Sequence, residues 1–141
     1  MPHCRVHLYF LVFACLSISV TAQALDFRSG EYELELRQSV KGMPAGMGTV
    51  AWRECLTQTN PIPTQYLQAH SCDLLESHTV YHTLHYKLSC YTDHGTLTNE
   101  GKVHFSRMKI HGNSRSDVGD VRGEKMVVRY KFKGRRIGDC H

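Results

Sequence analysis

Met126-Val-Val-Arg-Tyr-Lys-Phe-Lys133 is the most regular β pattern in this sequence of 141 residues, and Gly134-Arg-Arg-Ile-Gly-Asp-Cys-His141 follows it directly. Apolar residues alternate with residues that are mostly basic, which predicts a strand with one face in the core and one in solvent. Cys140 lies just beyond this strand and is available for a disulfide. We therefore expect the last eight residues to act as a clasp that fastens the end of the strand to the rest of the domain.

The first 24 residues have the pattern of a secretory signal peptide. Arg5 precedes an apolar run from Leu8 to Val20, and Ala22-Gln-Ala24 is a small-residue cleavage site. The run is about 13 residues long, whereas a membrane-spanning helix needs about 20. We therefore expect an exported domain of residues 25–141 that is not an integral membrane protein. A lipoprotein, with lipid on Cys15, is the alternative, which the continuing apolar run disfavours.

Charge and cysteine content narrow the class of the exported domain. After removal of Arg5 it has 16 basic and 13 acidic residues, a net charge of +3 with histidine neutral. This mild basicity is less than a nucleic-acid-binding protein usually carries, so we expect no nucleic-acid partner. An even number of cysteines in an exported chain predicts two disulfides, here among Cys55, Cys72, Cys90 and Cys140. The absence of a C-x-x-C pair argues against redox chemistry and a zinc ribbon.

Further period-two segments extend the β pattern. Gly30–Val40, Thr49–Leu56, Thr83–Cys90 and Thr96–Phe105 read as strands, and Ile110–Asp117 as a weak edge strand. The parity of the apolar positions slips near Ser106-Arg107, which predicts a bulge or a tight connection. The fold predicted from this pattern is all-β: an antiparallel meander of about six to eight strands, in a curled sheet or partly open barrel. One short helical segment within Pro61–His70 would cover one end.

A hairpin around Tyr81 suggests how the cysteines pair. If the turn is centred there, Cys72 lies opposite Cys90, Leu74 opposite Leu88, and His78 opposite Leu84. Cys55 is then left for Cys140. Four cysteines allow three pairings, and only this hairpin chooses among them.

The histidines and methionines raise the question of a metal site. On the pairing above, His78 and His82 face the core and His85 faces water, so three imidazoles do not converge, and we predict no metal or other cofactor. Met43 and Met47 are soft donors of the kind that bind Cu(I), but on a glycine-rich loop they are more simply apolar flaps over the sheet edge.

Several motifs together resemble a bacterial exported family catalogued as domain of unknown function 3617. They are Gly30-Glu-Tyr-Glu33, Gly42-Met-Pro-Ala-Gly-Met47, Cys55-Leu-Thr57, the pair Cys72 and Cys90, and Gly134-Arg-Arg-Ile-Gly-Asp-Cys140. The resemblance runs from about residue 28 to Cys140. It implies a periplasmic protein without an established activity and transfers no catalytic residue. The sequence departs from the family at Ser106-Arg107-Met108, where members have a Gly-Asp turn.

The leading functional hypothesis is a non-enzymatic periplasmic module for binding or envelope maintenance. An apolar or lipid-like ligand would contact the inner face of the curved sheet, formed by Tyr32, Leu34, Leu36, Tyr86, Leu88, Tyr130 and Phe132. One alternative is a periplasmic copper-handling protein. Another is a structural or protein-interaction module that presents a basic face to an anionic envelope component, with Arg129, Lys131, Lys133, Arg135 and Arg136 on that face. No motif places a nucleophile or a general base, so we expect no enzyme.

Overall fold

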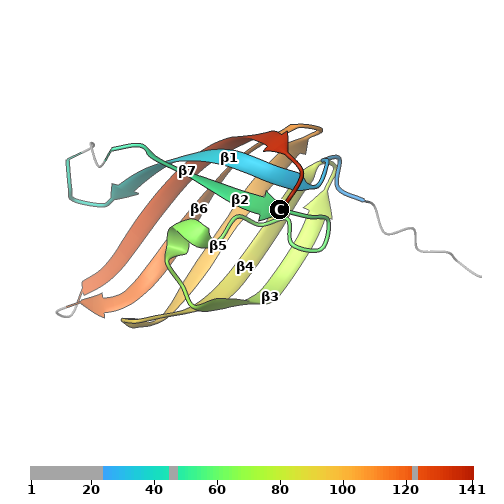
Figure 1. The fold of residues 1–141 in the computed structure, drawn as a ribbon. Helices are drawn as coiled ribbons and strands as arrows, with labels where there is room; N and C mark the ends of the chain where they lie inside the picture. Colours follow the sequence, from blue (N-terminus) through green and yellow to red (C-terminus); the bar gives the residue numbers. More distant parts are fainter. Residues whose placement is uncertain (1–23, 45–47, 122–123) are drawn as a thin grey trace, which may run out of the picture.

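The structure, a computed structural model, describes residues 24–44, 48–121 and 124–141. These residues form seven antiparallel strands in one open sheet with the order β2-β1-β7-β6-β5-β4-β3 (Figure 1). The elements in chain order are β1 (Gly30–Val40), β2 (Val50–Leu56), the 3-10 turn η1 (Gln65–Leu67), β3 (Ser71–Val80), β4 (Thr83–Thr92), β5 (Gly95–Ser106), β6 (Lys109–Val121) and β7 (Glu124–Gly138). The predicted all-β meander and its short helical segment are confirmed.

The predicted signal peptide lies almost entirely outside the described residues. Of the predicted signal peptide, only Ala24 falls within the described residues. No helix in the described ranges has the length and apolar character that a membrane span requires.

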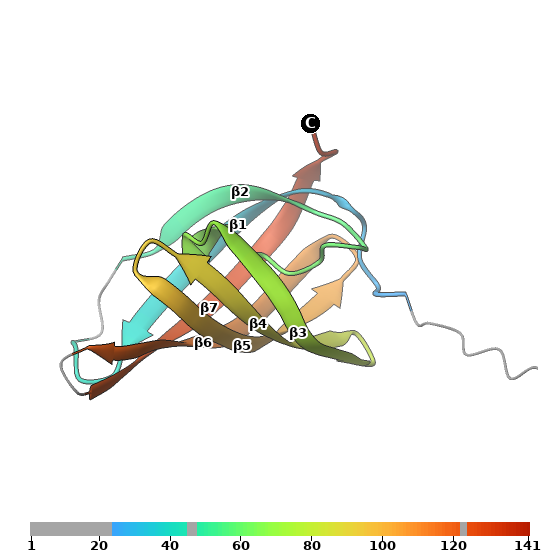
Figure 2. The same ribbon diagram turned by 90° about the horizontal axis from the view of Figure 1, so that it is seen from below.

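Residues 57–70, here called the strap, connect the two edges of the sheet. The strap leaves β2 at one edge and enters β3 at the other, and it crosses the inner face of the curled sheet between them (Figures 1 and 2). Ile62 and Leu67 of the strap are buried in the same core cluster as the inner side chains of the strands. The ring centroid of Tyr66 lies 5.0 Å from that of Tyr130 and 6.0 Å from that of Phe132. The strap therefore covers the apolar face that an open sheet would otherwise expose.

A buried carboxylate holds the strap at its centre. Glu54 of β2 is only 6% exposed. One of its oxygens accepts a hydrogen bond from the Thr64 backbone N–H at 2.9 Å, and the other accepts from the indole N–H of Trp52 at 2.9 Å and from the Gln65 backbone N–H at 3.4 Å. Glu54 thus supplies acceptors for backbone groups at the start of η1 that the short turn cannot satisfy itself.

The two predicted disulfides are confirmed, and they lie at the two ends of the strap. Cys55, just before the strap, is bonded to Cys140, so the predicted clasp is present. Cys72, just after the strap, is bonded to Cys90 in the neighbouring strand β4. The strap is therefore anchored covalently at both ends, at one end to Cys140 just after β7 and at the other to Cys90 in β4.

Two glycines let large core side chains lie across neighbouring strands. Gly112 lies opposite Phe132, and Gly134 lies opposite Leu34. A methyl group on Gly112 would come within 2.6 Å of the Phe132 ring, and one on Gly134 within 2.8 Å of Leu34 Cδ2. Any larger residue at either position would displace the packed side chain opposite.

The predicted register of the β3–β4 hairpin is correct near the disulfide and wrong near the turn. Leu74 lies opposite Leu88 as expected, but a bulge then places Glu76 opposite Lys87 and His78 opposite His85 instead of Leu84. A bulge adds one residue to a strand, so every later side chain moves to the other face. The prediction that His78 faces the core is therefore wrong.

The polar tract near residue 115 is also placed differently from the prediction. The predicted weak edge strand Ile110–Asp117 belongs to β6, which lies between β5 and β7 inside the sheet. Its alternation is weak because Ser114 and Ser116 occupy inner positions. The expected tight connection near Ser106-Arg107 is present, because Ser106 pairs with Lys109 across a two-residue turn in which Arg107 has φ of 47°.

Replacing Glu54 with alanine is expected to lower the free energy of unfolding by about 2–3 kcal/mol, because buried N–H groups on the strap and on Trp52 lose their acceptor. The matched control is Glu35→Ala, which removes an exposed carboxylate that pairs with Lys133 at 3.0 Å and should cost less than about 1 kcal/mol. Urea unfolding followed by circular dichroism measures both values. Equal losses in the two variants would show that Glu54 does not hold the strap.

Candidate functional site

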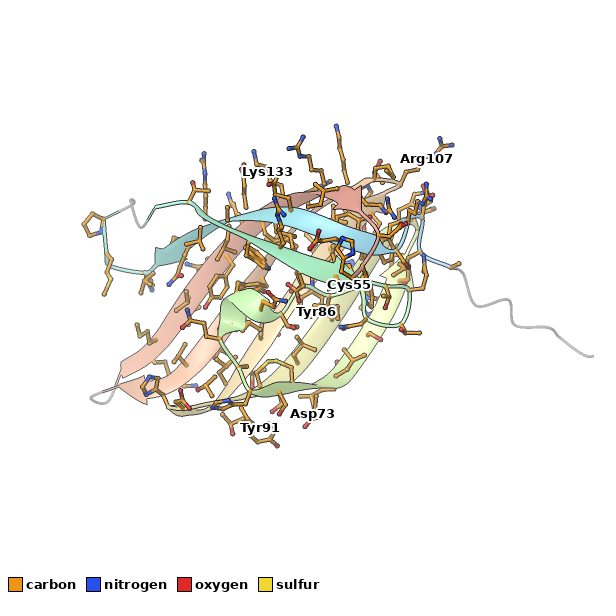
Figure 3. The ribbon with its side chains drawn as sticks, viewed as in Figure 1. Cys55, Asp73, Tyr86, Tyr91, Arg107 and Lys133 are labelled. Carbon is orange, nitrogen blue, oxygen red and sulfur yellow. A yellow bond between two sulfur atoms is a disulfide. The ribbon has the colours of Figure 1, made fainter. Side chains whose placement is uncertain are left out.

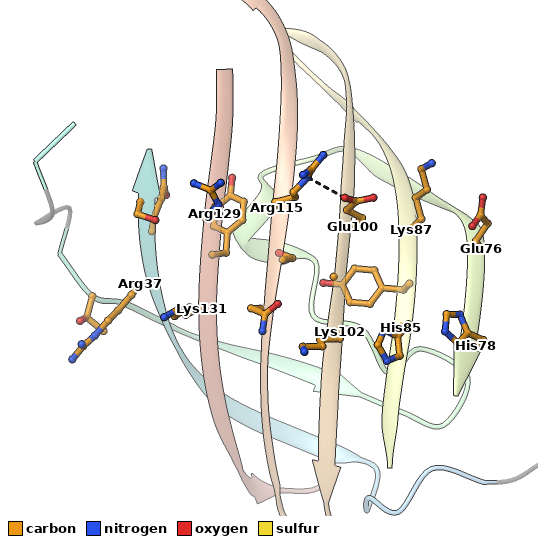
Figure 4. Close-up of a pocket in the computed structure, with 18 of the residues that line it drawn as sticks. Arg37, Glu76, His78, His85, Lys87, Glu100, Lys102, Arg115, Arg129 and Lys131 are labelled. Carbon is orange, nitrogen blue, oxygen red and sulfur yellow. Dashed lines mark ion pairs between the residues drawn. The ribbon is translucent and has the colours of Figure 1, made fainter. Parts of the chain in front are cut away.

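A trough of about 1250 Å³ lies on the outer face of the sheet, the face opposite the strap. It crosses six strands, from β1 through β7, β6, β5 and β4 to β3 (Figure 4). Outward-facing side chains of these strands line the trough, and the buried residues Tyr86, Ser114 and Tyr130 also contribute to its lining. The charged and imidazole side chains of its lining are Arg37, Glu76, His78, His85, Lys87, Glu100, Lys102, Arg115, Arg129 and Lys131.

One row of paired residues crosses the trough without a carboxylate. The strand register aligns, in order, Arg37, Lys131, Asn113, Lys102, His85 and His78, one residue from each of the six strands. We call this set the donor row, because every member can donate hydrogen bonds. With neighbouring strands about 4.8 Å apart, the donor row spans about 24 Å.

The next row of the trough mixes charges. It runs from Arg129 through Arg115, Glu100 and Lys87 to Glu76. Arg115 Nε lies 3.0 Å from Glu100 Oε1 (Figure 4). Arg115 Nη2 also lies 3.5 Å from Asp117 Oδ2.

The lining as a whole is cationic. It has six lysines and arginines against two glutamates, a net charge of +4 with histidine neutral. Across the described ranges, Arg115 is the one lysine or arginine of the lining with a carboxylate within 4 Å. The other five cations remain available to an anionic ligand.

The basic face predicted on β7 is divided into three parts. Arg129 and Lys131 line the trough. Lys133 and Arg135 each lie 3.0 Å from a glutamate oxygen of the neighbouring strand β1, so their charges are already balanced.

Arg136 does not share that face. Its side chain is only 8% exposed, its Nε donates to the Ser29 carbonyl oxygen at 2.9 Å, and its Nη2 pairs with Asp139. Arg136 therefore belongs to the clasp.

The seven side chains predicted to contact an apolar ligand all belong to the packed core. Tyr32, Leu34, Leu36, Tyr86, Leu88, Tyr130 and Phe132 are each at most 8% exposed. The strap fills the space in front of them with Ile62 and Leu67, which join the same cluster. Figure 3 shows side chains occupying the space between the strands and the strap.

A small polar cluster interrupts this core under the strap. The Tyr66 hydroxyl lies 2.7 Å from Ser114 Oγ, and Asn99 Nδ2 donates to Ser114 Oγ at 3.2 Å and to Ser116 Oγ at 2.9 Å. Burial raises the pKa of Tyr66 well above its ordinary value of 10.0, and the neighbouring Tyr86 phenol raises it further. Burial also raises the pKa of Tyr86. The neutral Tyr66 hydroxyl therefore connects the strap to Ser114 of the sheet.

The histidines form pairs on the outer surface. The rings of His78 and His85 stack with centroids 4.8 Å apart and planes 5° apart, and the centroids of the His104 and His111 rings lie 4.9 Å apart. His82 is exposed in the turn, so the prediction that it faces the core is wrong. The described part of the chain contains no group of three or more histidine, cysteine, aspartate or glutamate residues that could hold a metal.

Met43, the described methionine of the copper hypothesis, does not line the trough. Met43 is 57% exposed beyond the end of β1. Met47 lies outside the described residues.

Sequence reasoning missed most of the trough. It found Arg129 and Lys131, but it assigned no role to Arg37, Lys87 or Lys102. The available signal was that these residues occupy outward positions of predicted strands. Bringing them together in one trough requires the strand order and the register, which the local pattern does not contain.

The buried tyrosines predict how stability depends on pH. Because the folded-state pKa values of Tyr66 and Tyr86 are raised, the unfolded chain releases these protons first. Their contribution is complete below about pH 10 and is lost as the pH rises through the folded-state values. Urea unfolding at several pH values above and below about 10 should show this decline, and Tyr66→Phe should make it shallower. The same slope in both proteins would contradict the assignment.

Comparison with known proteins gives one match. Neither the curated proteins nor the solved structures include a match to this chain. The family model described as protein of unknown function (DUF3617) matches residues 27–140, which is most of the chain and includes the strap, both disulfides and all seven strands. The chain therefore belongs to DUF3617, a family of proteins of unknown function.

Proposed function

We propose that this protein is a non-enzymatic binding module that holds an extended polyanion in the trough. The observation that supports this most is the donor row, in which six neighbouring strands each present a hydrogen-bond donor and none presents a carboxylate. Three of the six, Arg37, Lys131 and Lys102, are charged, and no carboxylate of the described residues lies within 4 Å of them. A ligand that brings several negative charges would gain from all of them together.

The shape of the trough favours a chain-like ligand. A single small anion contacts two or three side chains, whereas a chain laid across the strands reaches the whole row of about 24 Å. A flat bilayer would touch the rims of a hollow but not its floor. Nucleic acid is also disfavoured, because single strands usually stack their bases on exposed aromatic rings. The two tyrosines in the lining, Tyr86 and Tyr130, have buried side chains.

The location proposed for this function is the periplasm. Two disulfides are typical of proteins that fold in an oxidising compartment, and the N-terminal sequence has the pattern of a signal peptide. Anionic polymers and phosphorylated surface molecules belong to that environment, so a role in envelope maintenance agrees with the proposed ligand.

The apolar or lipid-like ligand predicted from the sequence is a weaker candidate. Its seven contact residues are buried against the strap, so binding would require the strap to leave the inner face. Both ends of the strap are held by disulfides and its centre by Glu54. The copper alternative relies on Met43 and on Met47, and the second of these lies outside the described residues.

The proposal predicts salt-dependent binding of long-chain inorganic polyphosphate and of heparin, measured by calorimetry on the mature protein. The variant Lys102→Glu/Lys131→Glu should weaken binding about tenfold or more and should flatten the dependence of log K on log salt, because it removes two cations and adds two anions in the trough.

The matched control is Arg28→Glu/Arg53→Glu, which changes the net charge equally at two exposed positions outside the trough lining. This control should lose much less affinity than the trough variant. Equal losses would mean that binding follows net charge alone, and the absence of binding to both polymers would refute the proposed function.

A further inference from the structure

A smaller recess of about 210 Å³ lies beside the trough on the outer face, and the two share Lys102 and Asn113. Its lining is completed by Thr83, His104, His111 and the backbone at Gly112. We propose that this recess binds a phosphomonoester group of the ligand. The inference rests on the proposed function, because the recess would receive one group of the polyanion that lies in the trough.

Two cross-strand pairs of β5 and β6 give the recess its shape. Lys102 lies opposite Asn113, and His104 lies opposite His111. The Cβ atoms of directly opposite residues on neighbouring strands lie about 5 Å apart, and positions two residues apart along a strand are separated by about 7 Å. The four side chains therefore stand at the corners of a small rectangle, and a tetrahedral phosphate group at its centre is within reach of donors on every side.

A hydrogen bond orients one of the two imidazoles. Thr83 Oγ1 lies 3.0 Å from His104 Nδ1. This contact occupies Nδ1 and leaves Nε2 as the nitrogen available to a ligand. When the Thr83 hydroxyl is the donor, the proton of a neutral His104 ring is on Nε2, where it can be donated to a phosphate oxygen.

The charged residues around the recess are cations and carboxylates that already pair with a cation. On β6, Lys109 is two residues before His111, and Lys133 of β7 lies opposite His111. On β5, Glu100 is two residues before Lys102, but Arg115 already pairs with it at 3.0 Å. Glu35 of β1 pairs with Lys133 at 3.0 Å.

Further titratable groups lie near the recess, because Lys131 lies opposite Asn113 and His85 lies opposite Lys102. The His82 ring, in the β3–β4 turn, has its centroid 6.5 Å from that of His104. Counting Lys102 in its lining, the groups facing the recess are therefore mainly basic, and both nearby carboxylates have cation partners.

The mixture of donors and acceptors favours phosphate over sulfate. Asn113 Oδ1 and any neutral imidazole nitrogen accept hydrogen bonds, so a bound group must offer a proton to satisfy them. Monohydrogen phosphate and protonated phosphomonoesters carry such a proton, whereas sulfate only accepts. Because its second pKa is about 6, a phosphomonoester exchanges readily near pH 7 between a protonated form that can donate a hydrogen bond and a doubly charged form.

The test is calorimetric titration of the mature protein with inorganic phosphate and with sulfate at pH 7 and equal ionic strength. We expect saturable phosphate binding that is about tenfold tighter than sulfate binding, as one additional charge-assisted hydrogen bond would give. The variant His104→Thr/His111→Thr should weaken phosphate binding about tenfold or more. Lys102→Met should also weaken phosphate binding. Because methionine keeps the aliphatic part of the side chain, this loss would report the missing charge and not a change in strand packing.

The matched control is His94→Thr/His141→Thr, which removes two exposed histidines outside the lining of the recess and should leave phosphate affinity unchanged. Sulfate binding as tight as phosphate binding, or full phosphate affinity in the His104 and His111 variant, would overturn the inference. If polyphosphate still binds to the trough while inorganic phosphate does not bind at all, the recess assignment fails and the proposed function stands. If the unmodified protein binds neither polyphosphate nor inorganic phosphate, the proposed function itself is refuted.

Discussion

The strap, held at both ends by disulfides, is the constraint on which the rest of the structure depends. An open sheet has two edges and one apolar face that must be covered. Here one segment of 14 residues, 57–70, joins the two edge strands and covers that face, and the bonds Cys55–Cys140 and Cys72–Cys90 fix its two ends. Because the inner face is filled in this way, a partner has to use the outer face or the edges of the sheet.

The curvature of the sheet links the core to the trough. Large side chains such as Phe132 and Leu34 lie across glycines of neighbouring strands, which leaves room for them to pack on the inner face. A twisted sheet curves in opposite senses along its two diagonals, so a sheet wrapped around a core on one face can be hollow on the other. The trough crosses the strands, and the register that packs the core also aligns the donor row.

Local alternation was enough to predict the strands, the clasp and both disulfides, because each depends on neighbouring residues or on one hairpin. It failed where contacts between residues far apart in the sequence determine the structure. The bulge near Leu75 is not marked by glycine or proline, yet it moves His78 to the outer face. Strand β6 has little apolar alternation because Ser114 and Ser116 face inward, where Asn99 donates hydrogen bonds to both. The trough needs six strands in register, which no local pattern encodes.

The distribution of charge matters more here than its sum. A net charge of +3 on residues 25–141 gives no sign of a strongly basic surface. On β7, however, β1 glutamates balance Lys133 and Arg135. Lys131, two residues before Lys133 on the same strand, lies opposite Arg37 and has no described carboxylate within 4 Å. Acidic and basic residues are thus segregated along the same pair of strands. Since exposed ion pairs contribute little to stability, a surface that concentrates cations in a hollow and neutralises them next to it is more readily explained by selection for a ligand than by selection for folding.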